Sequence, residues 1–208
     1  MEKIDLRKEL KHLYAPSPKK VELVEVPEFL FVMIDGKIEP GQAPASSPDF
    51  HDALQALYGL AYTLKFASKL SKDNPIDYSV MALEALWSVE SGVLDLARPD
   101  DWTWTAMMLH PDHITEALFQ QALIQLRAKR PSPALDRLRL ERFREGLSIQ
   151  TLHVGPYSEE PATIERMKAF ARENGLVSHG RHHEIYLGDP RRTAPEKLKT
   201  VLRQPVQR

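Results

Sequence analysis

Three side chains that could bind or activate a small molecule alternate along one short segment: His182, Glu184 and Tyr186. The segment is rich in strand-forming residues, and side chains two apart on a strand share a face. Ile185 and Leu187 would then point to the opposite face, into a core. A carboxylate between an imidazole and a phenol can take up a proton or balance a positive charge on a ligand. The spacing therefore predicts a site in which Glu184 holds a mostly apolar ligand or activates a water against it.

Each of these three residues also has a plainer interpretation. Glu184 could be an exposed strand carboxylate, Tyr186 could pack with its hydroxyl at an edge, and His182 could make only a structural hydrogen bond. The two adjacent histidines point to opposite faces, and no His-x-x-x-His helix motif is present. With no cysteine in the chain, the sequence predicts no metal site and no cofactor.

Aromatic side chains elsewhere in the chain could line the same site. Trp87 and Trp104 belong to two further strand-like segments and would stack against a flat ligand, although core packing is the alternative for both. The remaining candidates for the lining are Tyr157, Tyr62, Phe66, Met33 and Glu84. Of these, Glu84 would add a second carboxylate, and Met33 would add an adaptable apolar contact.

Composition limits the class of protein. The 28 basic and 29 acidic residues nearly cancel, so the chain has no excess positive charge for nucleic acid. The charged N-terminus is unlike a signal peptide, and no apolar run approaches the ~20 residues of a membrane span. Together with the lack of cysteine, these features predict a cytoplasmic protein that binds neither nucleic acid nor membrane.

The patterning along the chain predicts alternating strands and helices. Residues 1–20 are polar and form an expected N-terminal arm. A helix is expected from the Ser47-Pro48 cap, a second over about 112–130, and a third from Ser158 to the stop at Asn174-Gly175. The expected strands are 21–38, 79–89, 102–110, 138–143, 147–154, 180–187 and 198–206, with a turn at Glu145-Gly146.

The two halves of this order repeat each other. Three blocks match in sequence order: 31–36 with 150–155, 84–87 with 184–187, and 107–111 with 201–205. We therefore expect an α/β (α+β) fold made of duplicated βαββ modules, which form a pseudo-twofold body with a central ligand pocket. The single domain spans 21–208, with a first module at about 21–110, the connecting helix, and a second module at about 135–208.

The C-terminal third of the chain resembles a known family. Residues 146–157, 182–190 and 197–206 are similar to the GyrI-like small-molecule-binding family, and the resemblance extends upstream through 102–111. It covers nearly the whole chain. It implies two βαββ modules around a central pocket that is lined by aromatic residues and contains a glutamate, here Glu184.

The resemblance also indicates two functions. The family includes effector-binding domains of multidrug-responsive regulators and stand-alone proteins, and some of the latter hydrolyse the cyclopropane ring of DNA-alkylating toxins. The chain leaves no room for a helix-turn-helix domain, so a regulator is not expected. One hypothesis is a detoxifying enzyme that uses Glu184, Tyr186 and His182. The alternative is a non-catalytic binder or sensor of cationic or aromatic drugs, and interaction with a protein such as gyrase has the least support.

Overall fold

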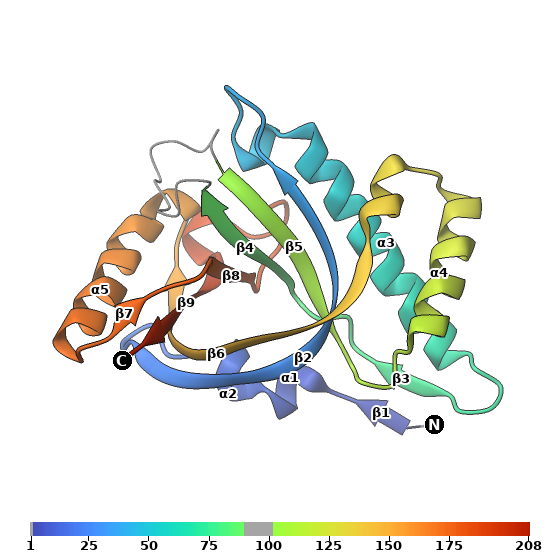
Figure 1. Cartoon of the computed structure of the whole chain (residues 1–208), viewed down its shortest axis with the longest axis horizontal. Coiled ribbons are helices and arrows are strands. Elements are labelled where there is room, and N and C mark those ends of the chain that lie inside the picture. Colours follow the sequence, from blue (N-terminus) through green and yellow to red (C-terminus); the bar gives the residue numbers. More distant parts are fainter. Residues whose placement is uncertain (1, 90–101) are drawn as a thin grey trace.

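The computed structural model describes residues 2–89 and 102–208, and its strands and helices alternate along the chain (Figure 1). The strands are β1 (Glu2–Ile4), β2 (Glu22–Lys37), β3 (Ile76–Tyr78), β4 (Leu83–Val89), β5 (Trp102–His110), β6 (Arg139–Val154), β7 (Val177–Ser178), β8 (His182–Tyr186) and β9 (Lys199–Gln207). The α-helices are α1 (Leu6–Glu9), α2 (Lys11–Tyr14), α3 (Pro48–Lys69), α4 (Glu116–Lys129) and α5 (Glu160–Glu173). Short 3₁₀ turns cover Pro44–Ser46, Pro133–Arg137, Tyr157–Glu159 and Pro195–Lys197.

The main sheet curls into a ring. Its strands follow the order β6-β2-β5-β4-β8-β9-β7, and an additional pairing of β6 with β9 closes the ring. All of these pairings are antiparallel. Each strand therefore has one face toward the interior of the ring, called here the inner face, and one outer face.

The long strand β6 was expected to be two strands joined by a turn at Glu145-Gly146. The structure instead has one continuous strand, in which Gly146 adopts a φ of +77°. The register with β2 runs on both sides of this point, from Val26 paired with Gly146 to Glu28 paired with Arg144. The residue between, Pro27, has no backbone N–H to donate to the ladder. The glycine therefore does not end the strand, and Glu145, which is opposite Pro27 and has no partner in the β2 register, stays within β6.

Three longer helices lie outside the ring (Figure 1). The Ser47 hydroxyl accepts from the Phe50 N–H and caps α3, as predicted, and Pro48 occupies the first turn. The cap of α4 is Thr115, so this helix begins a few residues after the expected start at about residue 112. Gly175, in the left-handed region with a φ of +64°, follows the end of α5, as expected.

The apolar core divides between the two faces of the sheet. On the outer face, α3 and α4 cover one cluster that includes Trp87, Trp104 and Phe119, and α5 covers a second cluster around Ile149 and Leu202. A third cluster fills the inner face; its buried members are Leu13, Tyr14, Val26, Phe31, Met33, Met81, Ala82, Leu86, Met107, Leu109, Ile185 and Val201. Since both faces carry core, neither β4 nor β5 shows the simple alternation of a half-exposed strand.

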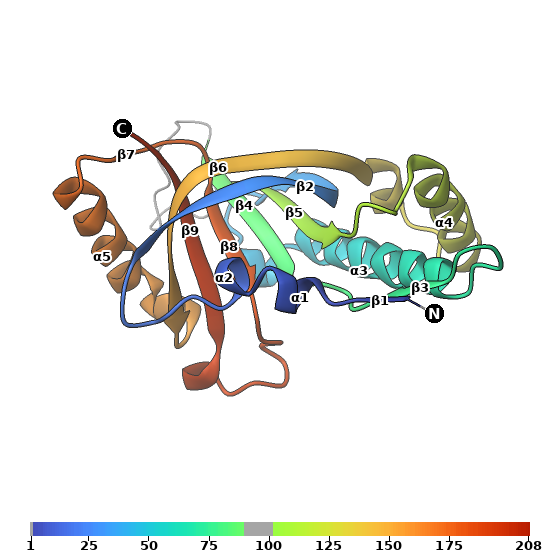
Figure 2. The same ribbon diagram turned by 90° about the horizontal axis from the view of Figure 1, so that it is seen from below.

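Residues 2–20 pack onto the ring and its neighbouring elements. Strand β1 pairs in parallel with β3, and α2 lies across one end of the ring (Figure 2). Leu13 and Tyr14 are buried in the inner cluster, so this segment completes the core.

When the short strands β3 and β7 are left aside, the order of elements contains two βαββ runs, β2-α3-β4-β5 and β6-α5-β8-β9, with α4 between them. The α+β class is as predicted, and the origin of the two runs by duplication stays a prediction. Among the described residues, no helix is long and apolar enough to cross a membrane.

Candidate functional site

The pairing of β8 with β4 and β9 decides which side chains share a face with Glu184. Glu184 is opposite Ala85 on β4 and Leu202 on β9, and Tyr186 is opposite Thr200. Because directly paired residues point the same way, His182, Glu184 and Tyr186 lie on the outer face beside Trp87. The alternation predicted from the sequence is the one that the structure has.

A chain of hydrogen bonds ends on the Glu184 carboxylate. The Tyr186 hydroxyl donates to Glu184 Oε2 at 2.6 Å, and the same hydroxyl accepts from the Trp87 indole Nε1 at 3.0 Å. On the other side, His182 Nε2 lies 3.5 Å from Glu184 Oε1. Burial, and then the charge of Glu184, raises the pKa of Tyr186 well above its ordinary value. The phenol therefore stays protonated and holds one carboxylate oxygen in place.

Tyr157 brings the start of α5 against this group. Its ring meets the ring of Tyr186 edge to face, with centroids 5.9 Å apart and an interplanar angle of 82°. The Tyr157 side chain is 40% exposed, so it lies where the site meets solvent. Burial raises its pKa to about 12, with smaller contributions from Glu160 and Glu184.

Glu160 is a member of this group that the sequence did not indicate. It is the first residue of α5, yet only 6% of it is exposed. Burial and the charge of Glu184 raise its pKa to about 9, while the Thr200 hydroxyl acts in the opposite direction. In the sequence, an acid in the first turn of a helix is common and mostly solvated, so no pattern separates Glu160 from Glu159.

Aromatic rings form the wall next to Trp87. Trp87 is opposite Trp104 in the β4–β5 register, and Phe50 of α3 contacts both indoles, with centroids 5.5 and 5.0 Å away. Trp102 meets Trp87 edge to face at 5.4 Å. Both Trp87 and Trp104 are almost fully buried in the outer core. Both therefore serve as core residues, and Trp87, through its bond to Tyr186, also borders the Glu184 group.

Four of the predicted lining residues lie elsewhere. Met33 and Glu84 are buried on the inner face, because Glu84 pairs with Ile185 and not with Glu184. Tyr62 and Phe66 are each 50% exposed on α3, where they line a separate surface groove of about 710 Å³. The structure thus groups Glu184, Tyr186, His182, Trp87, Trp104 and Tyr157, and it does not bring these four residues to them.

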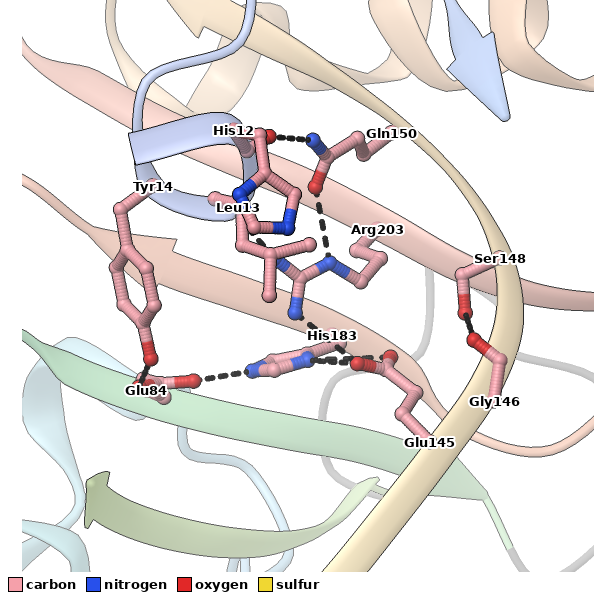
Figure 3. Close-up of polar contacts among 10 residues, drawn as sticks. All are labelled: His12, Leu13, Tyr14, Glu84, Glu145, Gly146, Ser148, Gln150, His183 and Arg203. Carbon is pink, nitrogen blue, oxygen red and sulfur yellow. Dashed lines mark hydrogen bonds and ion pairs between the residues drawn. The ribbon is translucent and has the colours of Figure 1, made fainter. Parts of the chain in front are cut away.

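A second polar cluster occupies the inner face of the same strands (Figure 3). The His183 imidazole lies between two carboxylates, with Nε2 3.0 Å from Glu84 Oε2 and Nδ1 3.0 Å from Glu145 Oε2. The Tyr14 hydroxyl donates to Glu84 Oε1 at 2.6 Å, and Arg203 Nη1 donates to Glu145 Oε2 at 3.1 Å. Two acids and two bases thus meet inside the ring.

The ionisation of this inner cluster follows from its pairing. Burial opposes the charge on Glu145, but His183 and Arg203 outweigh it and lower the pKa of Glu145 to about 2. Burial likewise opposes the charge on His183, but Glu145 and Glu84 outweigh it and raise the pKa of His183. The cluster is therefore a network in which Glu145 pairs with His183 and Arg203, and it ties β4, β6, β8 and β9 together.

The same network holds the N-terminal segment. Arg203 Nη2 donates to the Leu13 carbonyl at 2.8 Å, and Gln150 Nε2 donates to the His12 carbonyl at 2.7 Å. The cavity beside these groups holds about 10 Å³, room for about one water molecule. In residues 2–89 and 102–208, no three His, Asp or Glu side chains are arranged to hold a metal ion.

Comparison with known proteins adds a family and a fold. A family model described as a GyrI-like small molecule binding domain matches residues 108–207. An uncharacterized conserved protein from Listeria innocua is 41% identical, with 98% of this chain and 100% of that chain covered and a TM-score of 0.89. A hydrolase from the same organism is 40% identical over 99% of this chain and 100% of its own, with a TM-score of 0.86.

A more distant structure shows the fold alone. The C-terminal domain of EcmrR is 10% identical, with 91% of this chain and 98% of that domain covered and a TM-score of 0.54. A comparison with curated proteins found no match.

Proposed function

The chain belongs to the GyrI-like small-molecule-binding family, and from that premise we propose that it hydrolyses planar, electrophilic compounds at Glu184. The observation that carries the proposal is the carboxylate of Glu184. It is 87% buried, held by Tyr186 on one side, and bordered by aromatic rings. A nearby relative described as a hydrolase supports an enzyme over a pure binder.

The proposed substrate class is a flat compound whose strained cyclopropane ring is conjugated to a carbonyl. Glu184 would take a proton from a water, and the resulting hydroxide would add to a ring carbon. The carbon–carbon bond of the ring would break, and its electron pair would move to the carbonyl oxygen. Base catalysis of this kind contributes on the order of 10²–10⁴-fold, and orientation adds to it.

The other side chains support this chemistry in distinct roles. The Tyr186 proton is committed to Glu184, so Tyr186 positions the base. The imidazole of His182, 3.5 Å from Glu184, is the better candidate to polarise the substrate. Trp87 and Trp104 would supply the wall against which a planar ring system packs, together with Tyr157 at the solvent side. The proposed biological role is protection from such toxins in the cytoplasm.

The experiment uses a synthetic cyclopropane-fused cyclohexadienone and purified protein. Mass spectrometry should detect a product with the mass of one added water. Glu184→Gln keeps the shape of the side chain but cannot take up a proton, so turnover should be lost while most binding remains. The exposed Glu196→Gln is the matched control and should retain full turnover. Undiminished turnover in Glu184→Gln would contradict the mechanism.

A non-catalytic binder of aromatic cations is the second candidate. It is favoured by the same carboxylate, because an anion among aromatic faces suits a delocalised cation. In that case Glu184→Gln would weaken the binding of a cationic dye, measured by fluorescence, and no hydrated product would form from any compound.

A further inference from the structure

Glu160 is a buried carboxyl with no cation beside it in residues 2–89 and 102–208. It begins α5, where the partial positive charge of the helix would favour ionisation, yet its residue is 94% buried. Its Oε1 atom is buried and has no hydrogen-bond partner among the described residues. A buried carboxylate oxygen without a donor is costly, whereas a neutral carboxylic acid at the same place is much less so.

Glu160 shares its neighbours with Glu184, the proposed base. On β9, Thr200 lies next to Glu160 and is paired in register with Tyr186. On β8, Glu184 is close enough for its charge to act on Glu160, and Glu160 in turn acts on Tyr186 and Tyr157. Three factors therefore influence the ionisation of Glu160: its burial, the Glu184 carboxylate and the Thr200 hydroxyl. Burial and the charge of Glu184 raise the pKa of Glu160 to about 9.

Glu145 shows what a different set of neighbours does to the same side chain. Both glutamates are more than 90% buried, and both lie against the strand pair β8–β9. Glu145 has His183 and Arg203 at 3.0 and 3.1 Å, and its pKa is lowered to about 2. Glu160 is instead under the influence of the charge of another carboxylate, Glu184, and carries no such partner among the described residues. The contrast assigns opposite protonation states to the two acids at neutral pH.

We propose that Glu160 is a protonated carboxylic acid that serves as the proton donor opposite the base Glu184. This inference rests on the proposed function and specifies the ligand further. The acceptor must be an oxygen on the substrate, so the site would favour a neutral, planar compound with a conjugated carbonyl over a cation. Two carboxyl groups that share one proton across a site are a known arrangement for acid–base catalysis.

With Glu160 included, the reaction balances. Water gives one proton to Glu184 and its hydroxide to the ring carbon. The broken carbon–carbon bond leaves its electron pair on the carbonyl oxygen, which takes the proton of Glu160. The product is the ring-opened alcohol, and the enzyme is left with Glu184 protonated and Glu160 ionised. Transfer of one proton from Glu184 to Glu160 restores the starting state, with one water consumed.

The kinetic test measures kcat and KM for the cyclopropane-fused cyclohexadienone against pH. As pH rises through about 9, wild-type turnover should fall because Glu160 loses its proton. Glu160→Gln keeps a hydrogen-bond donor but has no proton to give, so kcat should fall by about 10²–10⁴-fold with little change in KM. The residual kcat of this variant should not fall as pH rises through about 9. Glu159→Gln, the exposed neighbour, is the matched control and should behave as wild type.

Infrared difference spectroscopy tests the protonation state without any substrate. The spectrum of wild type minus Glu160→Gln at pH 7 should contain the C=O stretching band of a protonated carboxylic acid. In Glu184→Gln, which removes the neighbouring charge, the band should titrate at lower pH.

The kinetic and infrared measurements together distinguish failure of the proposed hydrolase function from failure of the role given to Glu160. Full turnover in Glu184→Gln defeats the proposed function, whatever the infrared result. A different result would defeat only the assignment of Glu160. In that result, Glu184→Gln loses turnover, whereas Glu160→Gln keeps both the wild-type kcat and the wild-type decline at alkaline pH. Absence of the carboxylic acid band at pH 7 overturns the protonation state and the inference with it.

Discussion

At the scale of single residues, the Tyr186 hydroxyl organises the Glu184 group on the outer face. It accepts from the Trp87 indole and donates to Glu184, so it joins the aromatic wall to the carboxylate. Because the group is buried, each bond that is lost leaves a polar atom without water to replace the partner. The position of the base thus depends on a residue that need not touch the substrate.

Tyr186→Phe tests this connection. The variant keeps the ring contact with Tyr157 but strands the Trp87 N–H and one oxygen of Glu184, so the free energy of unfolding should fall by about 1–3 kcal/mol. Urea unfolding measures the change. Tyr157→Phe is the control, since Tyr157 is 40% exposed and lies where the site meets solvent. Equal stability of the two variants would contradict the role given to Tyr186.

At the scale of elements, the inner network joins four strands to the N-terminal segment. Arg203 is its central member, because its three nitrogens donate to Glu145, Gln150 and the Leu13 carbonyl. Helix α2 is only four residues long and too short to be stable alone. Its position therefore depends on these contacts and on the burial of Leu13 and Tyr14.

Arg203→Met should be strongly destabilising. The substitution leaves the buried Glu145 carboxylate with one cationic partner fewer, and breaking such a buried pair costs about 3–5 kcal/mol. Urea unfolding gives the free energy, and limited proteolysis after residue 11 reports release of the segment. Arg191→Met is the control: that arginine pairs with Asp189 but is 86% exposed, so the free energy of unfolding should barely change. A small effect at Arg203 would show that the network is not important for stability.

Strand β2 approaches the aromatic wall at Gly36. A Cβ atom there would lie 2.1 Å from Cζ2 of Trp104, so Gly36→Ala must displace the indole. We expect a loss of about 1–3 kcal/mol and a shift in tryptophan fluorescence. Gly59→Ala on α3 is the control, since its Cβ would meet only the side chain of Leu126 at 3.3 Å and alanine favours a helix. An unchanged emission spectrum in Gly36→Ala would argue against the contact.

At the scale of the whole molecule, the buried acids and His183 together predict how stability depends on pH. Glu145 has a pKa of about 2 against an ordinary 4.5, so its contribution is present above 4.5 and is lost as pH falls toward 2. His183 has a raised pKa, so its contribution is present below the ordinary 6.5 and is lost as pH rises through the folded value. The pKa of Glu160 is raised from 4.5 to about 9, so its contribution to stability is likewise lost as pH rises from 4.5 to about 9.

The sum of these contributions places the maximum of stability in mildly acidic solution. Urea midpoints measured from pH 3 to pH 9 should rise up to about 4.5–6.5 and then decline. In Glu160→Gln the decline on the alkaline side should be shallower, because one of its two causes is removed. A maximum near pH 9 would contradict the assigned ionisation states.

Much of the fold could be predicted because its signals are local. The cap at Ser47, the glycine after α5 and the alternation of His182, Glu184 and Tyr186 depend on a few adjacent residues, and the structure has all three. The turn at Glu145-Gly146 was wrong because the same glycine can end a strand or bend it. The choice depends on Pro27 and the rest of β2, more than a hundred residues away.

The sequence by itself determined that Glu184 shares a face with Tyr186 and His182, because a strand has a period of two whatever surrounds it. Only the tertiary structure decided which other residues join them. The antiparallel register between β4 and β8 sends Glu84 to the inner face, and the packing of α5 on β9 brings Glu160 within the influence of the Glu184 charge. The ionisation of each acid follows from these long-range neighbours, since burial and nearby charge set a pKa and neither can be read from adjacent residues.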